Sequence, residues 1–338
     1  MKRKIYLQKK AGSLKNLILK EDILTENREN EVTVEVKSIG LNFADIFAIK
    51  GLYSATPKGE FIPGLEYSGV VIRKEKKVNG IEIGDRVMGA SKFGSYASHL
   101  NIDYRYTRKL KDSWTFEDGA SFLVQALTAF YALVILGSIK ENRVVLIHSA
   151  AGGVGIWANR IAQKFNAFTV GTLGNISKAN IIKDENYGAL FERNKNFKIE
   201  IDKILNGKKP DIILDPVGGR YFKEGYEILN QGGRLITYGS ANFNVGRNRP
   251  DYLKVLLKYL TRPKIDPMQM INRNKSVMGF NLIYLWDRIE EMGRYTDELI
   301  AMDLGKPKID SVHRFENLKD ALYYFQEGRS TGKIVVSI

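Results

Sequence analysis

A short turn rich in small residues lies where an apolar, strand-like segment gives way to a helical pattern. The segment Val144–Ile147 is followed by the turn Ala150–Gly155. Gly152 leaves the backbone free to approach a pyrophosphate, and Gly155 lets the following helix pack closely on the strand. The helix N-terminus offers unpaired N–H groups to phosphates. Because the turn has the required strand and helix around it, we predict that it binds a dinucleotide. The alternative is a tight turn without a ligand, and Ala150 replaces the usual first glycine.

The segment about twenty residues beyond the turn distinguishes between the two nicotinamide dinucleotides. Enzymes that use NAD usually place an acid there to hold the ribose 2′-hydroxyl. Here Gly171–Lys178 contains no acid, and the next one is Asp184. Ser177 and Lys178 can instead receive a 2′-phosphate, which a carboxylate would repel. This pattern favours NADPH over NADH; the alternative for Lys178 is an ordinary solvated lysine.

The elements that must hold this turn alternate between strand and helix. Apolar strand-like segments are separated by helical patterns, and they are Val144–Ile147, Phe168–Thr172, Asp211–Asp215 and Gly233–Tyr238. Apolar strands that alternate with helices are typical of a parallel sheet covered on both faces. We therefore expect an α/β fold with a doubly wound parallel sheet in this half of the chain.

Both ends of the chain differ from this middle part. Residues 1–122 contain short alternating segments bounded by glycine or charged turns, which is typical of β-rich structure. After Gly279 the expected elements are two helices and two strands, at Leu282–Met302, Leu318–Gln326, Ile309–Val312 and Lys333–Ile338. We expect the two ends to build one β-rich lobe, with the α/β lobe inserted between them.

Composition narrows the classes of protein. With 338 residues, 44% of them hydrophobic and 27% charged, the chain suits two folded lobes. It has no cysteine, which excludes disulfides, thiolate metal ligands and a cysteine nucleophile. The three histidines, His99, His148 and His313, show no ligand spacing. The net charge of +14 would attract polyanions; the alternative is simply a lysine-rich surface.

Neither a signal peptide nor a membrane span is expected. The basic start, Met1–Leu7, leads into a strand-like segment without an apolar stretch. The best apolar run, Phe122–Gly137, contains Gln125 and Thr128 and falls short of the roughly 20 apolar residues that a span needs. We expect a cytoplasmic protein, with peripheral attachment to a membrane left open.

Taken together, the motifs resemble the medium-chain dehydrogenase/reductase superfamily, in its zinc-free quinone oxidoreductase branch. The resemblance covers essentially the whole chain and is nearest to the vesicle amine transport protein 1 homologues. It is carried by Gly40–Asp45, Gly51–Tyr53, Pro63–Val71, Gly84–Val87, Ala150–Gly155, Asp215–Gly219, Tyr238–Asn242 and Gly332–Val335. It implies a GroES-like catalytic domain from residues 1–122 and 279–338, and a Rossmann domain over residues 123–278. The active site would lie in the cleft between them.

The resemblance also implies site residues. Asn42 and Tyr53 would line the cleft near the nicotinamide and act in catalysis. The residues placed at the cofactor are Asn42, Thr128, Ala151, Gly152, Gly153, Val154, Gly155, Thr172, Ser177, Lys178, Tyr238, Gly239, Ser240, Gly279, Phe280, Asn281 and Lys333. Such reductases often carry a tyrosine against the 2′-phosphate where this chain has Phe191, which would soften the preference for NADPH. Leu65 precedes Glu66 where zinc-dependent members have a histidine, so zinc is not expected.

The expected absence of zinc limits the reactions that the protein can catalyse. Without a Lewis acid, alcohol oxidation loses the group that would stabilise an alkoxide, whereas hydride delivery to a quinone or enone needs less help. The protein would hold the cofactor against the acceptor and supply a hydrogen-bond donor, for which Asn42 and Tyr53 are the candidates. The alternative for Tyr53 is aromatic packing, and Asp45 is expected to be structural. We expect NADPH-dependent reduction of an ortho-quinone such as phenanthrenequinone.

The segment 243–275 has a different character. It carries eight Lys or Arg against two Asp, interleaved with leucine and tyrosine. Such a basic amphipathic stretch can lie on an anionic membrane; the alternatives are a cover for the Rossmann edge or for a dimer partner, and RNA binding through charge alone. A second hypothesis is therefore a catalytically weak relative that acts through a membrane surface or RNA. The resemblance implies a homodimer through edge strands, near Tyr238–Val245.

Overall fold

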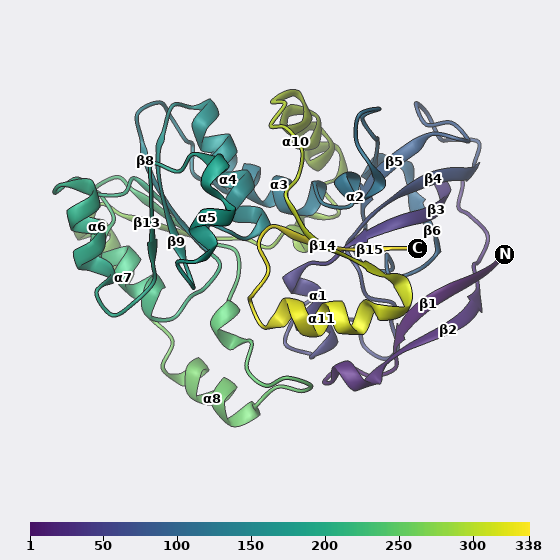
Figure 1. Cartoon of the computed structure of the whole chain (residues 1–338), viewed down its shortest axis with the longest axis horizontal. Helices are drawn as coiled ribbons and strands as arrows, with labels where there is room; N and C mark the ends of the chain where they lie inside the picture. Colours follow the sequence, from purple (N-terminus) through teal and green to yellow (C-terminus); the bar gives the residue numbers. More distant parts are fainter.

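The computed structural model describes residues 1–338, and two large sheets lie side by side in it (Figure 1). A parallel sheet occupies the left of Figure 1, and a mainly antiparallel sheet occupies the right, with both chain termini on that side. A two-stranded ribbon of β1 (Lys2–Gln8) and β2 (Leu17–Ile23) lies beside the second sheet. Two sheets of different type confirm the expected division of the chain into α/β and β-rich parts.

The parallel sheet has six strands in the order β10-β9-β8-β11-β12-β13. Their bounds are β8 (Val144–His148), β9 (Phe168–Leu173), β10 (Ala189–Glu192), β11 (Ile212–Asp215), β12 (Arg234–Thr237) and β13 (Ser276–Gly279). Numbered along the chain, this order is 3-2-1-4-5-6, which is the doubly wound order of dinucleotide-binding folds. Ligands bind such sheets at the carboxyl edge, where the order reverses between β8 and β11.

Apolar residues on both faces of β8 explain why this sheet is covered on both sides. Val145 and Ile147 belong to the core shared with the helix after the glycine turn, α4 (Gly153–Lys164). Val144 and Leu146 belong to the opposite core, shared with α6 (Phe197–Leu205) and α7 (Arg220–Ile228). Because successive residues of a strand point to opposite faces, an all-apolar strand needs a helical layer on each side.

The second sheet has seven strands and takes elements from both ends of the chain. Six strands run in the order β14 (Ile309–Arg314), β15 (Lys333–Ser337), β3 (Glu31–Gly40), β4 (Glu66–Lys74), β5 (Arg86–Ala90) and β7 (Thr107–Lys109), and β6 (His99–Asp103) pairs with β3. The last strand, β15, pairs antiparallel with β3 and aligns Val335 with Gly40. The prediction that both chain ends share a β-rich lobe is therefore confirmed.

The remaining elements are the other helices. The other α-helices are α1 (Phe43–Ile49), α2 (Phe116–Gly119), α3 (Leu123–Phe130), α5 (Lys178–Ile181), α8 (Tyr252–Leu260), α9 (Pro267–Arg273), α10 (Ile289–Ala301) and α11 (Leu318–Gln326). Single turns of other helix types are η1 (Leu14–Asn16), η2 (Tyr104–Tyr106), the π-helical η3 (Tyr131–Leu136), η4 (Lys183–Glu185), η5 (Ala241–Phe243), η6 (Leu282–Leu285) and η7 (Phe315–Asn317). The single helix expected over Leu282–Met302 is interrupted, because Arg288 leaves helical geometry between η6 and α10.

One helical run is longer and more apolar than the sequence analysis expected. Residues Phe116–Leu136 reach a mean hydropathy of 1.9, and by length and composition alone they could cross a membrane. However, 67% of this stretch is buried inside the fold. Its middle part, α3, packs against α4 and α10. The run is a core element between the two sheets, which explains its apolar composition.

The segment expected to carry edge-strand pairing is not a strand. Residues 238–245 contain the single turn η5 and lie beyond the end of β12, which is itself an interior strand. The free edges of the parallel sheet are β10 and β13. Strand pairing between two copies would therefore need one of those two edges, which corrects the predicted region.

Candidate functional site

The glycine turn joins β8 to α4 at the carboxyl edge of the parallel sheet. Ser149 turns the chain with a φ of 58°. A Cβ on Gly155 would lie 2.5 Å from the Ser149 carbonyl oxygen, and one on Gly153 would lie 1.7 Å from Oε1 of buried Gln125. These two positions need glycine for packing within the protein. Gly152 is less constrained, because its Cβ would meet only the Ser149 oxygen, at 3.2 Å.

The first turn of α4 presents backbone N–H groups without a side-chain cap. Gly152 is the N-cap residue and has no side chain to accept from them. The neighbouring carbonyl of Ala151 is engaged, because it accepts from the Gly332 amide at 2.8 Å. Uncapped amides at a helix N-terminus attract anions through their partial positive charge. The space that a Cβ would fill at Gly152 and these amides together fit a pyrophosphate.

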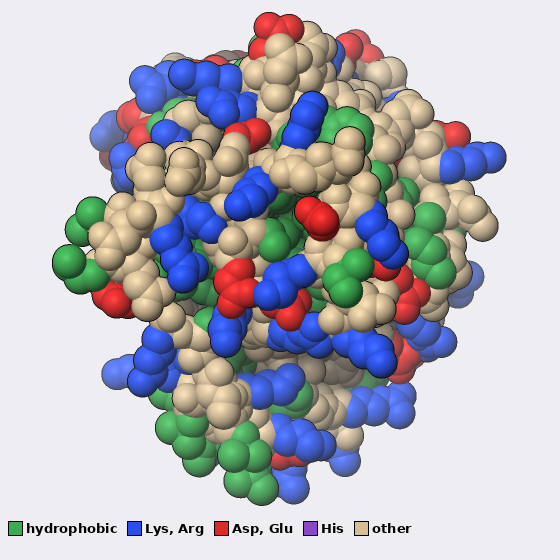
Figure 2. Space-filling model, turned by 90° about the vertical axis from the view of Figure 1, so that its left-hand side faces the viewer, with side chains coloured by type: hydrophobic (Ala, Val, Ile, Leu, Met, Phe, Trp, Pro, Cys, Tyr) green, Lys and Arg blue, Asp and Glu red, His purple; other side chains and the backbone are tan.

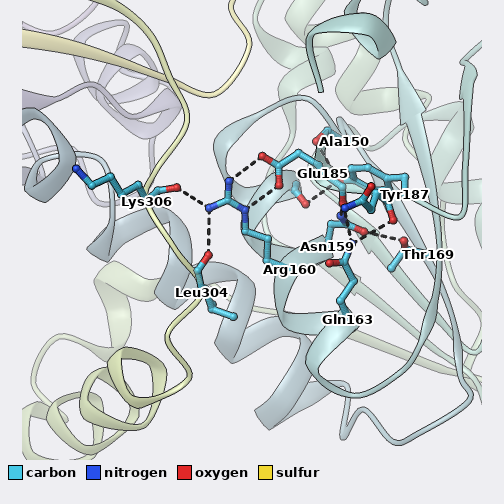
Figure 3. A network of polar contacts seen from close by, with 11 residues as sticks. Ala150, Asn159, Arg160, Gln163, Thr169, Glu185, Tyr187, Leu304 and Lys306 are labelled. Atoms are coloured by element: carbon cyan, nitrogen blue, oxygen red, sulfur yellow. Dashed lines mark hydrogen bonds and ion pairs between the residues drawn. The ribbon is translucent and has the colours of Figure 1, made fainter. Parts of the chain in front are cut away.

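A polar network holds the turn in place (Figure 3). The Tyr187 hydroxyl donates to the carbonyl oxygens of Ala150 and Gly155, at 3.0 and 2.8 Å. On α4, Arg160 forms a two-pronged ion pair with Glu185, with both N–O distances at 2.7 Å. Because these bonds link α4 to the chain between β9 and β10, the helix start has a fixed position relative to the sheet.

The same arginine ties α4 to the C-terminal part of the chain. Nη1 of Arg160 donates to the carbonyl oxygens of Leu304 and Lys306, at 3.2 and 2.6 Å (Figure 3). Those residues lie between α10 and β14. The contact therefore connects the helix of the glycine turn to the segment that leads into the second sheet.

Lys178 lies near the turn but is already engaged. Its Nζ donates to the carbonyl oxygens of Gly328 and Ser330, at 2.6 and 2.8 Å. Burial lowers its pKa, and the neighbouring Arg193 adds to the effect. The predicted partner Ser177 is exposed, and its hydroxyl has no protein partner. Lys178 is therefore not an ordinary solvated lysine, since it fastens the loop between α11 and β15.

Arg193 is the site residue that the sequence analysis missed. It follows β10, and its Nη1 donates to Oγ of Ser149 at 3.1 Å. Its guanidinium lies 5.6 Å from the centroid of the Tyr221 ring. It forms no ion pair, and burial lowers its pKa. An arginine without a carboxylate partner beside an uncapped helix start is suited to a phosphate or to stacking on a base. Its signal in the sequence was hidden because β10 was not among the predicted strands.

Phe191 does not face the glycine turn. It is buried and its ring stacks with Phe197 at 6.0 Å, in the core on the α6 side of the sheet. The next residue, Glu192, accepts from the Ile176 amide at 2.9 Å. The argument from Phe191 about the 2′-phosphate is therefore wrong in its geometry, because the residue belongs to the core.

Thr172 is a structural residue of β9. Its hydroxyl pairs with Nδ1 of His148 at 2.8 Å, and both side chains are fully buried. Burial lowers the pKa of His148 to about 3, so this ring stays neutral. The backbone carbonyl of Thr172 accepts from the Ala150 amide at 3.0 Å. Thr172 thus holds the turn through its backbone carbonyl, and its side chain is not available to a ligand.

Asn42 and Lys333 meet in a buried charged cluster with Glu66. Nζ of Lys333 lies 2.5 Å from Oε2 of Glu66 and 2.9 Å from Oδ1 of Asn42. The Asn42 amide nitrogen faces the Gly40 carbonyl at 3.2 Å. The other Glu66 oxygen accepts from the Val124 amide at 3.0 Å. The structure brings these predicted residues together, but it orients them towards each other.

Tyr53 is paired with Asn281. The Tyr53 hydroxyl donates to Oδ1 of Asn281 at 2.7 Å. Burial raises the pKa of Tyr53 to about 12, so its phenol stays protonated at neutral pH. Asn281 also caps η6, where its Oδ1 lies 3.4 Å from the Ile283 amide. Both contacts use the same oxygen, so the amide nitrogen of Asn281 is left as a free donor.

The residues that follow β12 and β13 lie together at the carboxyl edge of the sheet. The Tyr238 and Phe280 rings are 6.0 Å apart, and Phe280 also lies 5.0 Å from Tyr131. Gly239 packs on Pro216, where a Cβ would lie 2.9 Å from the carbonyl oxygen. The remaining predicted residues are Ser240 and Gly279, which are exposed, Thr128, whose hydroxyl donates to the Val124 carbonyl, and Val154, which is partly buried against the core.

No group of three or more His, Asp or Glu side chains is placed to hold a metal ion. Two surface hollows lie away from the glycine turn. One lies between η2 and α10, and the other lies at the amino edge of the parallel sheet, around Asn142 and Lys275. Neither hollow contains a predicted site residue.

Comparison with known proteins agrees with this geometry. The family model for the alcohol dehydrogenase GroES-like domain matches residues 28–112, and the one for zinc-binding dehydrogenases matches residues 189–336. The chain is 32% identical to the synaptic vesicle membrane protein VAT-1 homolog of Rattus norvegicus over 309 residues, which is 90% of this chain and 76% of that protein. The human homolog is 31% identical, with 90% and 78% covered.

Solved structures show the same fold. The human VAT-1 homolog-like protein superposes with a TM-score of 0.86 at 27% identity and covers 100% of this chain and 98% of its own. The Escherichia coli quinone oxidoreductase complexed with NADPH gives a TM-score of 0.84 at 24% identity, with both chains fully covered. The chain therefore belongs to the medium-chain dehydrogenase/reductase superfamily, with a GroES-like and a Rossmann-type sheet, and is a relative of the VAT-1 homologs.

Proposed function

We propose that this protein is an NADPH-dependent, zinc-independent reductase of quinones or enones. The observation that carries the proposal is the uncapped start of α4 beside an arginine, Arg193, that has no ion-pair partner. Amides and an unpaired guanidinium at one edge fit a dinucleotide that bears an additional phosphate. The likeness to a quinone oxidoreductase whose structure holds NADPH supports the same cofactor.

When bound, such a cofactor supplies a hydride to an electron-poor acceptor. The residues of this chain hold the acceptor and donate hydrogen bonds to its oxygen atom, on which negative charge develops during hydride transfer. The donor is the free amide nitrogen of Asn281, and Tyr53 orients it, because the protonated phenol donates to Oδ1 of Asn281 at 2.7 Å. Asn42, whose Oδ1 accepts from Nζ of Lys333 at 2.9 Å, is a positioning residue.

The proposal that the reaction needs no zinc rests on the side chains that are available as metal ligands. The chain has no cysteine, and Leu65 stands where zinc-dependent relatives carry a histidine. Thiolate and imidazole are the groups that zinc prefers in such enzymes. Polarisation of the acceptor must then come from hydrogen-bond donors, which restricts the substrates to acceptors that are already electron-poor.

The assembly and domain limits belong to the same proposal. We place the domain boundaries at residues 122 and 279, with β13 closing the Rossmann sheet. Homodimerisation would pair the edge strand β13 with its copy. A cytoplasmic location is compatible with the burial of the apolar run between the two sheets.

The test uses purified full-length protein. NADPH and NADH binding is measured by calorimetry, and oxidation of NADPH is followed with phenanthrenequinone and a panel of quinones and enones. We expect tighter binding of NADPH than of NADH, and turnover that dialysis against a chelator leaves unchanged. Binding without turnover of any acceptor would reject the reductase and favour a cofactor-binding protein without catalysis. Loss of activity on chelation would reject zinc-independence.

A further inference from the structure

Lys50 is a buried lysine without an acid partner. Figure 2 shows Lys and Arg side chains gathered on the surface of the molecule, whereas Lys50 and Lys333 are the only fully buried lysines. Lys333 is paired with Glu66, but Lys50 forms no ion pair. Burial lowers the pKa of Lys50 to about 8, so its amine is charged at neutral pH. Because a buried charge is costly unless hydrogen bonds stabilise it, the partners of this amine are informative.

Three oxygen atoms from two parts of the fold surround the Lys50 amine. Its Nζ donates to Oε1 of Gln326, at the end of α11, at 2.8 Å. It also donates to Oδ1 of Asn244 and to the Gly246 carbonyl oxygen, each at 2.8 Å. Asn244 and Gly246 follow β12 of the parallel sheet, whereas α1 and α11 belong to the part with the mainly antiparallel sheet. These three bonds, called the Lys50 clasp below, therefore join the two parts.

Residues 244–249, called the crossing loop below, have a second attachment to the same part. The Asn248 carbonyl oxygen accepts from the Leu14 amide at 2.9 Å, and Oδ1 of Asn248 accepts from the Tyr323 hydroxyl at 2.7 Å. In Figure 1 this stretch, coloured green, lies below α1 and α11 on its way to α8. The Asn248 bonds hold the end of the crossing loop, whereas Lys50 holds its beginning.

The Lys50 clasp lies between two loops of the proposed site. Lys50 ends α1, and Tyr53 lies in the loop that follows directly. On the other side, the crossing loop continues from η5, where the Ala241 amide donates to the Pro216 carbonyl oxygen at 2.9 Å. This bond fixes η5 to the chain after β11, at the carboxyl edge of the parallel sheet. The predicted cofactor residues 238–240 come immediately before η5.

A shift of one of these loops would therefore be transmitted to the other through Lys50. Catalysis that depends on orientation is sensitive to shifts of about 1 Å in groups remote from the reacting atoms. We propose that Lys50 is a positioning residue, whose bonds to the crossing loop set residues 238–240 against the loop of Tyr53, and thereby the cofactor against the acceptor. This role rests on the proposed reductase function, whereas the fixing of the two loops can be tested without turnover.

Three single variants separate the Lys50 clasp from general stability. Lys50→Met removes the charge and all three bonds while it keeps a long, unbranched side chain. Asn244→Ala removes one acceptor at a half-buried position, and it carries the test if Lys50→Met does not fold. The matched control is Lys275→Met, because Nζ of Lys275 also donates to two backbone carbonyls, each at 2.9 Å, but at the amino edge of the parallel sheet.

Amide hydrogen exchange of the full-length proteins without cofactor tests whether the clasp fixes the loops. We expect Lys50→Met to speed exchange in residues 51–56 and 241–246 by at least about tenfold, as expected when bonds that oppose local opening are lost. Asn244→Ala should have a smaller effect in the same segments, and Lys275→Met should leave both unchanged. Unchanged exchange in both loops of the first two variants, or an equal rise along the whole chain, would overturn the proposal.

Kinetics of the same proteins tests the role in the reaction. With NADPH and phenanthrenequinone, kcat should fall about tenfold in Lys50→Met, while the Kd for NADPH changes less than about threefold. A lysine that only stabilises the fold would leave kcat per folded molecule unchanged, and that result would reject the positioning role. A wild type that binds NADPH but reduces no acceptor would reject the reductase and with it the positioning role, whereas the exchange result alone decides whether Lys50 fixes the loops.

Discussion

The Tyr53 hydroxyl and Oδ1 of Asn281 are 2.7 Å apart, although 228 positions separate the two residues in the chain. The bond links the loop that follows α1 to the cap of η6, just beyond β13. One residue comes from the β-rich part and the other follows the last strand of the parallel sheet. Because Asn281 directly follows β13, the bond ties the loop after α1 to the carboxyl edge of the parallel sheet.

Replacing Tyr53 by Phe tests this pair. The variant keeps the ring and loses the bond that orients Asn281, so kcat for phenanthrenequinone should fall about tenfold, the equivalent of one net hydrogen bond. The Kd for NADPH should stay the same. The matched variant Asn281→Ala should show a similar loss, and the double variant should lose little more than either single one. Unchanged kcat in Tyr53→Phe would reduce Tyr53 to a packing residue.

The site shows what the sequence can and cannot predict. The glycine turn was predictable because strand, turn and helix lie within a few consecutive residues, as at His148–Gly153. The partners of Lys333 were not, since Glu66 is 267 positions away and its role depends on how β15 meets β4 through β3. Arg193 acquires its role only once the order of strands brings the end of β10 near Ser149.

The solvent exposure of apolar helices was the other property that could not be predicted from the sequence. A run such as 252–260 has the pattern of a helix that covers something, and the alternatives of membrane, lobe edge and dimer partner followed from that pattern. Only the folded chain shows that its leucines face solvent. Conversely, the apolar run 116–136 lies inside the fold, a place that its composition alone does not distinguish from a membrane.

Removing the Arg193 guanidinium should separate the two nicotinamide dinucleotides. Arg193→Ala is expected to weaken NADPH binding about tenfold to a hundredfold, the effect of losing charge-assisted hydrogen bonds to a phosphate. Binding of NADH should change much less. Calorimetric titration of both dinucleotides measures the ratio, and Arg220→Ala, a surface arginine paired with Glu224, serves as the control. Equal losses for NADPH and NADH would mean that Arg193 contacts the adenosine and not the 2′-phosphate.

Alanine substitutions at two glycines of the turn should have different effects, one on stability and the other on NADPH binding. Gly155→Ala places a Cβ 2.5 Å from the backbone oxygen of Ser149, so the protein should lose stability, by about 1–3 kcal/mol as for other overpacked sites. Gly152→Ala meets that oxygen at 3.2 Å and should keep most of its stability. Its methyl group would occupy the space of the pyrophosphate, so NADPH affinity should fall. Urea unfolding and NADPH titration of both variants measure the two effects. A Gly152→Ala protein with normal affinity would argue against the predicted place of the phosphates.

The buried pair Lys333 and Glu66 should be costly to break from one side. Lys333→Met leaves the Glu66 carboxylate buried without its cation, which typically costs about 3–5 kcal/mol. The double variant Lys333→Met/Glu66→Leu removes both charges and should recover much of that loss. Free energies of unfolding from urea titrations give the comparison. A double variant that is as unstable as the sum of two single variants would show that packing, not the charge pair, dominates here.

Asp45 should give the free energy of unfolding a dependence on pH. Its carboxyl is fully buried and accepts from the Asn42 amide and the Tyr96 hydroxyl, at 2.8 and 2.9 Å. Burial is the main cause that raises its pKa from 3.8 to about 7. The folded protein therefore holds this proton more tightly than the unfolded chain does. The stabilisation is complete below about pH 4 and is lost as the pH rises through about 7.

The variant Asp45→Asn removes this titration while it keeps an acceptor for the same donors. At about 1.4 kcal/mol per pKa unit, the wild type should lose several kcal/mol relative to the variant between about pH 4 and about pH 7. Urea unfolding of both proteins across that range measures the difference. The two curves should diverge steadily with increasing pH and run parallel above pH 7. If they run parallel throughout, Asp45 has the same pKa in the folded and unfolded states, and its capping bonds offset the cost of its burial.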